Sequence, residues 1–212
     1  MLLSEDTFII SDTHFGDYDS IANGFDKYLV DAWNKTVSEN DTVLHMGDFT
    51  SDCPDMVIEE KIKKYSKLLN GRIFLIRGNH DTAARCVYEK NSIELVDDFR
   101  NPWWHAVSGI VKDVKILFSH YPVKNIYTIL NRLSYPPDEG YARYLDEDPF
   151  EFPIQYLHDI FIENKFDINI HGHIHHKTSL FDNLINVSPD NIGYAPVRIR
   201  EILAEKMPQD KK

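Results

Sequence analysis

Apolar residues fall into short runs that are separated by longer stretches in which they recur at helical spacing. In the first ninety residues, the runs Thr7–Ser11, Thr42–Met46 and Arg72–Arg77 predict short buried strands. Between these runs, helical spacing predicts one amphipathic helix over Ile21–Val37 and another from Pro54 to the Asn70-Gly71 pair. Alternating strands and helices are typical of a parallel sheet with covering helices.

The second half of the chain has a different pattern. A helix expected over Asp81–Lys90 ends the alternation, and Trp103–Ser108 and Lys112–Phe118 resemble a hairpin that turns around Ser108-Gly109. A further helix is expected over Ile154–Asn164. Short strands then follow at Ile168–Ile170, Ile185–Val187 and Val197–Ile202. These short strands predict a second sheet, so the expected fold is α/β, with two packed sheets flanked by helices.

We interpret the 212 residues as a single domain, because one core can be built from a chain of this length. One segment, at about residues 121–153, is rich in tyrosine, proline and acids, with a possible helix over Ile126–Leu133. Loops longer than about 12–15 residues are uncommon unless they have structure or a function of their own. The segment is therefore either a solvated insertion or a lid over the site, since it leaves directly from the loop of His120.

The formal net charge of −11 bears on the binding partner. Proteins that bind nucleic acid usually carry basic surfaces that neutralise phosphates, and the longest basic run here is Lys61-Ile62-Lys63-Lys64 on an expected helix. Nucleic acid is therefore disfavoured, though not excluded. A small phosphate ester remains a plausible substrate, because bound metal cations would reverse the local field.

We expect a cytoplasmic protein that does not enter a membrane. Met1–Thr7 lacks the features of a signal peptide, and no stretch approaches the roughly 18 apolar residues of a membrane-spanning helix. Cys53 and Cys86 fit neither a disulfide framework nor a zinc-finger spacing. The oligomeric state has no signature in the sequence.

Five polar clusters follow the ends of expected strands. Taken singly, most of them are equally typical of turns or of a histidine satisfied by the backbone. In an open α/β sheet, however, loops at the carboxyl ends of strands converge on one crevice, where ligands bind. The clusters are Asp12-Thr13-His14, Gly47-Asp48, Gly78-Asn79-His80-Asp81, Ser119-His120 and His171-Gly172-His173.

Together the clusters supply carboxylates, an amide oxygen and four or five imidazoles. This mixture suits borderline divalent cations such as Mn²⁺, Fe²⁺ or Zn²⁺ better than an all-oxygen Ca²⁺ site. Seven ligands are too many for one tetrahedral ion. They suit two ions that share a bridging carboxylate, about 3.5–4 Å apart, as in two-metal hydrolysis.

The ordered motifs resemble those of the calcineurin-like metallophosphoesterase superfamily, with its D-x-H, G-D, G-N-H-[DE], H and G-H-x-H signatures. This chain has SDTH, MGDF, RGNHD, SHYP and HGHIHH in that order, across residues 9 to 176. The opening SDTHFG and the short chain also resemble small bacterial or phage-encoded predicted phosphoesterases. The resemblance implies a four-layer α/β/β/α sandwich, with two central mixed sheets flanked by helices.

The resemblance also implies a role for each motif residue. It assigns Asp12, His14 and His173 to a first metal, and Asp48 to a bridging position between two metals. It assigns the second metal to Asn79, His120 and His171. Mn²⁺ would be the most common choice of metal, with Fe, Zn or Ni as alternatives.

Two residues of the G-N-H-D motif are expected to act in catalysis. His80 would face the substrate, where it stabilises phosphoryl charge or protonates the leaving oxygen. Asp81 would orient His80 or a ligating imidazole. The implied reaction is hydrolysis of a phosphate ester by in-line attack of a hydroxide that bridges the metals. The preferred substrate is a small-molecule phosphodiester or nucleotide.

Three other functions fit parts of the pattern. The same fold can serve as a non-catalytic interaction scaffold, although the intact ligand set and His80 favour an enzyme. A phosphomonoesterase or protein phosphatase would use the same motifs. A mononuclear zinc module built on HGHIHH would leave the earlier clusters unexplained.

Overall fold

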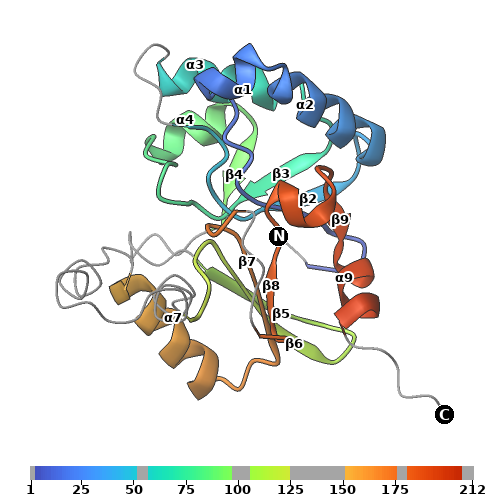
Figure 1. Cartoon of the computed structure of the whole chain (residues 1–212), viewed down its shortest axis with the longest axis vertical. Coiled ribbons are helices and arrows are strands. Elements are labelled where there is room, and N and C mark those ends of the chain that lie inside the picture. Colours follow the sequence, from blue (N-terminus) through green and yellow to red (C-terminus); the bar gives the residue numbers. More distant parts are fainter. Residues whose placement is uncertain (1–2, 52–56, 97–105, 125–150, 176–180, 207–212) are drawn as a thin grey trace, which may run out of the picture.

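The computed structural model describes residues 3–51, 57–96, 106–124, 151–175 and 181–206. Two sheets stack between helices in this part of the chain (Figure 1). The first sheet has the strand order β4-β3-β2-β1-β9, and the second has the order β5-β6-β7-β8. The expected α/β/β/α sandwich with two central mixed sheets is confirmed.

The first sheet is parallel except for its last strand, which runs antiparallel to β1. Its strands are β1 (Phe8–Ile10), β2 (Thr42–His45), β3 (Arg72–Leu75), β4 (Ile93–Leu95) and β9 (Val197–Arg198). Its outer face carries α1 (Tyr18–Ala22), α2 (Phe25–Thr36), α3 (Ile58–Ser66) and α4 (Arg85–Lys90) (Figure 1). The expected alternation of strand and helix in the first half is therefore confirmed.

The second sheet pairs an antiparallel hairpin with two parallel strands. Its strands are β5 (Ala106–Val111), β6 (Val114–Ser119), β7 (Ile168–His171) and β8 (Leu184–Asn186). Helix α7 (Glu151–Glu163) covers its outer face, while α8 (Pro189–Ile192) and α9 (Ile199–Lys206) follow β8 and β9. Among the described residues, no helix is both long and apolar enough to cross a membrane.

The layers follow from the two-residue period of the strands, which sends successive side chains to opposite faces. Phe8 and Ile10 of β1 join the core under α2 and α3, whereas Ile9 between them joins the core between the sheets. In β6, Ile116 and Phe118 enter that same inter-sheet core. Their neighbour Leu117 packs instead with Leu157 and Phe161 of α7. Each sheet thus buries both faces.

Two predictions about the second half of the described region, one of a turn and one of a strand, were wrong. The hairpin turns at Lys112–Asp113, both with positive φ, and Gly109 lies within β5 opposite Ile116. The strand expected over Val197–Ile202 keeps only two strand residues, which join the first sheet, and then becomes α9. The reason is packing: Ile199, Ile202 and Leu203 have helical spacing and bury together in the inter-sheet core.

The expected first helix is also interrupted, because Asn23 and Gly24 separate α1 from α2 and Gly24 has a φ of +71°. The helix expected from Asp81 begins only at Arg85. The expected helix start at Pro54, the helix over Ile126–Leu133 and most of the proposed lid lie outside the described residues.

Candidate metal centre

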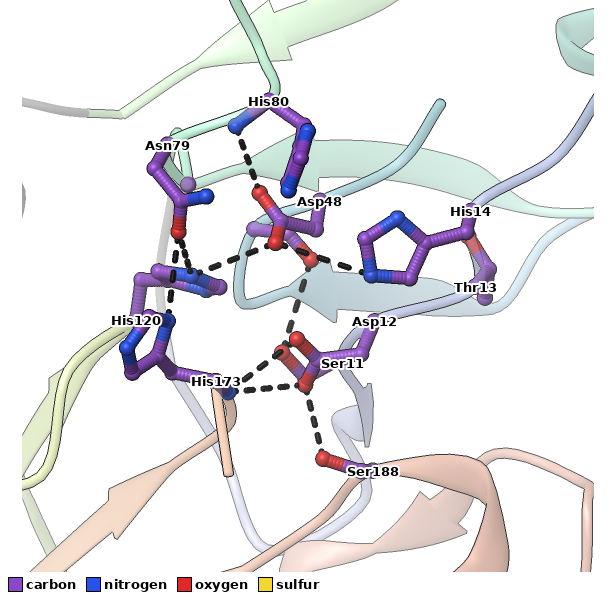
Figure 2. Close-up of polar contacts among 12 residues, drawn as sticks. Ser11, Asp12, Thr13, His14, Asp48, Asn79, His80, His120, His173 and Ser188 are labelled. Carbon is purple, nitrogen blue, oxygen red and sulfur yellow. Dashed lines mark hydrogen bonds and ion pairs between the residues drawn. The ribbon is translucent and has the colours of Figure 1, made fainter. Parts of the chain in front are cut away.

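The polar clusters converge at one edge of the two sheets (Figure 2). Each follows the carboxyl end of a strand: β1, β2, β3, β6 and β7. Their ligand-type atoms form three groups, and within each group the atoms lie within 4.8 Å of one another. Because neighbouring groups share residues, the three groups form one continuous cluster. Their members are Asp12, His14 and His175; His14, Asp48 and His80; and Asp12, Asp48 and His120.

Asp12 is buried and held by donors from two other loops. The backbone N–H of His173 donates to both carboxylate oxygens at 3.0 Å, and the Ser188 hydroxyl donates to Oδ2 at 2.7 Å. Burial alone would raise the pKa of Asp12. Electrostatic attraction to the His120 and His175 rings and the bond from Ser188 outweigh burial and hold that pKa below its usual value. Asp12 is thus an anionic carboxylate in a fixed orientation.

Asp48 lies between two histidine rings. Its Oδ2 is 3.6 Å from His14 Nε2 and 3.4 Å from His120 Nε2, while its Oδ1 accepts the backbone N–H of His80 at 2.9 Å. Only 1% of the Asp48 surface is exposed, so water does not screen this carboxylate. Its position between the rings suits a carboxylate that bridges two cations.

The side-chain oxygen of Asn79 faces nitrogen atoms of two histidine rings. Its Oδ1 is 3.0 Å from His120 Nε2 and 3.2 Å from His173 Nδ1. His120 Nδ1 is 3.0 Å from the carbonyl of Met46, which can only accept, so Nδ1 carries a proton. His120 Nε2 faces the Asn79 oxygen and, at 3.4 Å, the Asp48 carboxylate, so a cation placed among these atoms would have oxygen and nitrogen ligands around it.

Burial keeps three of these histidines neutral at physiological pH. It lowers the pKa of His14 and of His171 to about 4 and that of His173 to about 2, with only partial compensation from the nearby Asp12 carboxylate. A neutral imidazole is the form that binds a metal. The Nε2 atoms of His14 and His171 are buried without a hydrogen-bond partner, which leaves both nitrogens available to a cation.

His175 was not among the expected ligands, yet it belongs to the group of Asp12 and His14. Its ring stacks on that of His14. The G-H-x-H signature contained the signal, because it also fits Gly172-His173-Ile174-His175. When the signature is aligned with residues 172–175, its two histidines are His173 and His175. The side chain of His173 lies beside Asn79 and His120.

His171 occupies a different environment from the other expected ligands. It is fully buried in β7, with Nδ1 2.9 Å from the carbonyl of Gly172, and none of the three groups includes it. Its assignment to a metal stays a prediction. Its neighbour Ser11, with a buried hydroxyl 2.9 Å from the carbonyl of Met46, ties the loop after β1 to β2.

The two expected catalytic residues both contact Asp48: the backbone N–H of His80 donates to its carboxylate, and Asp81 accepts from its backbone N–H. His80 contributes a ring to one ligand group and contacts the ring of His14 edge-on, at 5.2 Å between centroids. Asp81 is buried and accepts from the backbone N–H groups of Asp48, Gly78 and Phe49 at 2.7–3.1 Å. Asp81 therefore fastens the loop of Asp48 to that of Asn79; its expected role of orienting a histidine stays a prediction.

Burial and the adjacent Asp48 raise the pKa of Asp81 to about 7, although its backbone donors oppose that shift. Two buried carboxylates this close repel each other. A divalent cation on Asp48 would relieve the repulsion, which is a second physical reason for a metal here.

Close backbone packing explains two of the motif glycines. A Cβ atom on Gly172 would overlap Ser11 Oγ and Asp12 Oδ2, and one on Gly78 would overlap the Asp48 carboxylate. The loops can approach closely only because these side chains are absent. Ligand residues carry strain in turn: positive φ occurs at Asp12, His14, Asp48, His173 and His175.

The remaining histidines behave as structural residues where the structure describes them. His45 is fully buried in the core, and its Nε2 lies 3.0 Å from the Thr13 hydroxyl. His158 Nδ1 lies 3.1 Å from the carbonyl of Val123. His105 and His176 lie outside the described residues.

Comparison with known families agrees with this geometry. The family described as calcineurin-like phosphoesterase matches residues 7–177, which include every ligand-type residue discussed above. The chain therefore belongs to the calcineurin-like phosphoesterase family, whose fold and candidate metal ligands it carries.

Individual relatives extend the comparison without naming a substrate. The uncharacterized protein MJ1445 of Methanocaldococcus jannaschii is 35% identical over 86 residues, which are 35% of this chain. The chain spans about half, 46%, of the length of that relative. A protein of unknown function from Aquifex aeolicus, AQ665, is 27% identical with a TM-score of 0.62, covering 92% of this chain and 96% of that one. A novel archaeal phosphodiesterase is 19% identical with a TM-score of 0.41, covering 86% and 82%.

Proposed function

We propose that this protein is a dinuclear metal-dependent phosphoesterase that hydrolyses a small phosphodiester or nucleotide. The observation that carries the proposal is that ligand-type oxygen and nitrogen atoms from several loops converge on one place. The Asp48 carboxylate and the Asn79 oxygen lie within hydrogen-bond or ion-pair distance of the His14, His120 and His173 rings, and the buried Asp12 carboxylate belongs to the same cluster. Acceptors arranged in this way bind cations, and the mixture of oxygen and nitrogen suits Mn²⁺, Fe²⁺ or Zn²⁺.

The ligand groups favour a revised assignment. Asp12, His14 and His175 would hold the first ion, because their ligand atoms form one group. Asn79, His120 and His173 would hold the second, since the Asn79 oxygen lies within 3.2 Å of both rings. Asp48 would bridge them, because its carboxylate belongs to groups on either side.

When bound, such ions supply Lewis-acid chemistry, neutralising phosphoryl charge and making water a nucleophile at neutral pH. The chain itself provides the frame and a proton donor. Asp81 holds the Asp48 and Asn79 loops together through backbone hydrogen bonds. His80 stands at the edge of the cluster, with its backbone anchored on Asp48, and would protonate the leaving oxygen.

The choice of a small diester rests on charge. A net charge of −11 disfavours a long polyanion, whose phosphates would have to approach an acidic surface. A small ester needs only the local field of the ions. The tyrosine-rich segment at about residues 121–153 remains our candidate for the part that selects the substrate, which deletion of Tyr135–Asp148 would test across a nucleotide panel.

The direct test is metal-stimulated release of nitrophenol from bis-p-nitrophenyl phosphate, with p-nitrophenyl phosphate as the matched monoester. We expect Mn²⁺ to stimulate diester hydrolysis and metal analysis to find two ions per chain. Asp48→Asn should abolish the activity, whereas Asp31→Asn on the exposed face of α2 should preserve it. Absence of hydrolysis with every divalent metal would favour the scaffold alternative, and faster monoester hydrolysis would favour a phosphatase.

A further inference from the structure

The segment from the end of β8 into α8 places three polar side chains against the candidate first metal site. We infer that Asn186, Ser188 and Asn191, here called the β8–α8 cluster, are positioning residues that fix Asp12 and His175 for binding an ion. All three lie beyond residues 7–177, the part of the chain that matches the family. The inference rests on the metal centre of the proposed function and adds the residues that set its affinity.

Ser188 orients the Asp12 carboxylate from outside the ligand set. Its hydroxyl donates to Asp12 Oδ2 at 2.7 Å, as Figure 2 shows, and its side chain is fully buried. The backbone N–H of His173 also contacts Asp12. Donors from two loops thus fix how the carboxylate faces His14 and His175.

The position of Ser188 makes this contact informative. Ser188 is the N-cap residue of α8, where a serine hydroxyl usually accepts a bond from the helix backbone and stabilises the helix. Here the side chain makes no such capping bond. The hydroxyl donates to Asp12 instead. Ser188 therefore contributes a contact at the candidate site and no capping bond to α8.

Asn186 and Asn191 hold the other ligand. Each donates from Nδ2 to the backbone carbonyl of His175 at 2.6 Å. His175 has a φ of +49°, a left-handed conformation that is unfavourable for a residue with a side chain. Two amide donors on its carbonyl stabilise that conformation, which turns the ring onto His14.

The cluster is internally connected as well. Asn186 Oδ1 accepts the backbone N–H of Ser188 at 3.0 Å and lies 2.7 Å from its hydroxyl. Asn186 therefore links the segment that holds Asp12 to the one that holds His175. Partners of metal ligands commonly change metal affinity by about 10–100-fold when removed.

The experiment is Mn²⁺ titration of the metal-free full chain by calorimetry, with electron paramagnetic resonance to distinguish coupled from isolated ions. Asn191→Ala is the principal variant, because Asn191 is exposed and its loss leaves the core intact. Ser188→Ala is the second variant. Asn164→Ala is the matched control, since it removes an equivalent amide-to-carbonyl bond at the end of α7.

We expect Asn191→Ala and Ser188→Ala to weaken one of two binding events by about 10–100-fold and to leave the other unchanged. Asn164→Ala should change neither. In a His175→Ala background, adding Asn191→Ala should alter the remaining event by less than about twofold, because the two residues act on one site.

Equal weakening of both events, or unchanged binding in Asn191→Ala, would overturn the inference. A parent protein that binds two ions but hydrolyses no phosphate ester would overturn the proposed function and leave the inference standing. A parent that binds no ion would overturn both.

Discussion

His14 and His175 stack with their ring centroids 5.0 Å apart and their planes 14° from parallel. Their sequence separation spans most of the chain, since one ring follows β1 and the other follows β7. The stack joins the two sheets at the candidate metal centre. It also brings both rings into one ligand group with the Asp12 carboxylate.

Replacing His175 tests its assignment to the first ion. We expect His175→Ala to remove one ion from the pair and to lower diester hydrolysis by more than the roughly 10–100-fold typical of residues that only support a ligand. His158→Ala is the control, because it removes a histidine that contacts a backbone carbonyl outside the metal cluster. Retention of both ions in His175→Ala would restore His173 to the first site and His171 to the second.

Replacing His80 tests whether catalysis can be lost while metal binding is kept. We expect His80→Ala to lower turnover by about 10²–10⁴-fold, the range of general acid–base catalysis, while both ions stay bound. An ester with a better leaving group should lose less activity, because it needs less protonation. Loss of an ion from His80→Ala would instead make His80 a ligand, since its ring already lies in a group with His14 and Asp48.

Much of the site follows from the ends of the strands. The apolar runs before Asp12, Asp48 and Asn79 are long enough to identify buried strands, and parallel strands bring their carboxyl-end loops to one edge. That reasoning correctly expected these polar clusters to converge. It needs no knowledge of how the side chains pack.

The rest of the site depends on contacts that are distant in sequence. HGHIHH contains four histidines, and only the loop geometry places His175 beside His14. Asn186 and Ser188 resemble ordinary turn residues until the β8–α8 loop meets Asp12. Over the six residues Val197–Ile202, the spacing of apolar residues fits either a strand or a helix. The burial of Ile199 and Ile202 in the inter-sheet core favours the helix.

Gly172 tests whether close approach of the loops is required. A Cβ at this position would overlap Ser11 Oγ and Asp12 Oδ2, so we expect Gly172→Ala to weaken Mn²⁺ binding by at least about 10-fold. Gly24→Ala is the control: its φ of +71° carries strain of about 1 kcal/mol, but its Cβ would meet open space. Equal effects of the two variants on metal affinity would contradict the packing argument.

The pH dependence of the metal-free protein tests the neutral histidines. His14 and His173 have folded pKa values of about 4 and about 2, against about 6.5 when unfolded, so unfolding takes up protons as pH falls below 6.5. The free energy of unfolding should therefore decrease from pH 7 toward pH 4. Asp81 acts in the opposite direction over about pH 4–7, because its folded pKa is raised to about 7.

The histidines outnumber Asp81 when His45 and His171, with pKa values of about 3 and about 4, are included. We therefore expect a net loss of at least about 1 kcal/mol per pH unit, the linkage of one proton, between pH 6 and pH 5. Urea unfolding in a chelator at several pH values measures this slope. His14→Asn should reduce the slope by about one proton, because it removes one neutral histidine from the folded state. A slope of zero, or stability that rises on acidification, would show that these imidazoles are protonated in the folded protein and are not poised to bind metal.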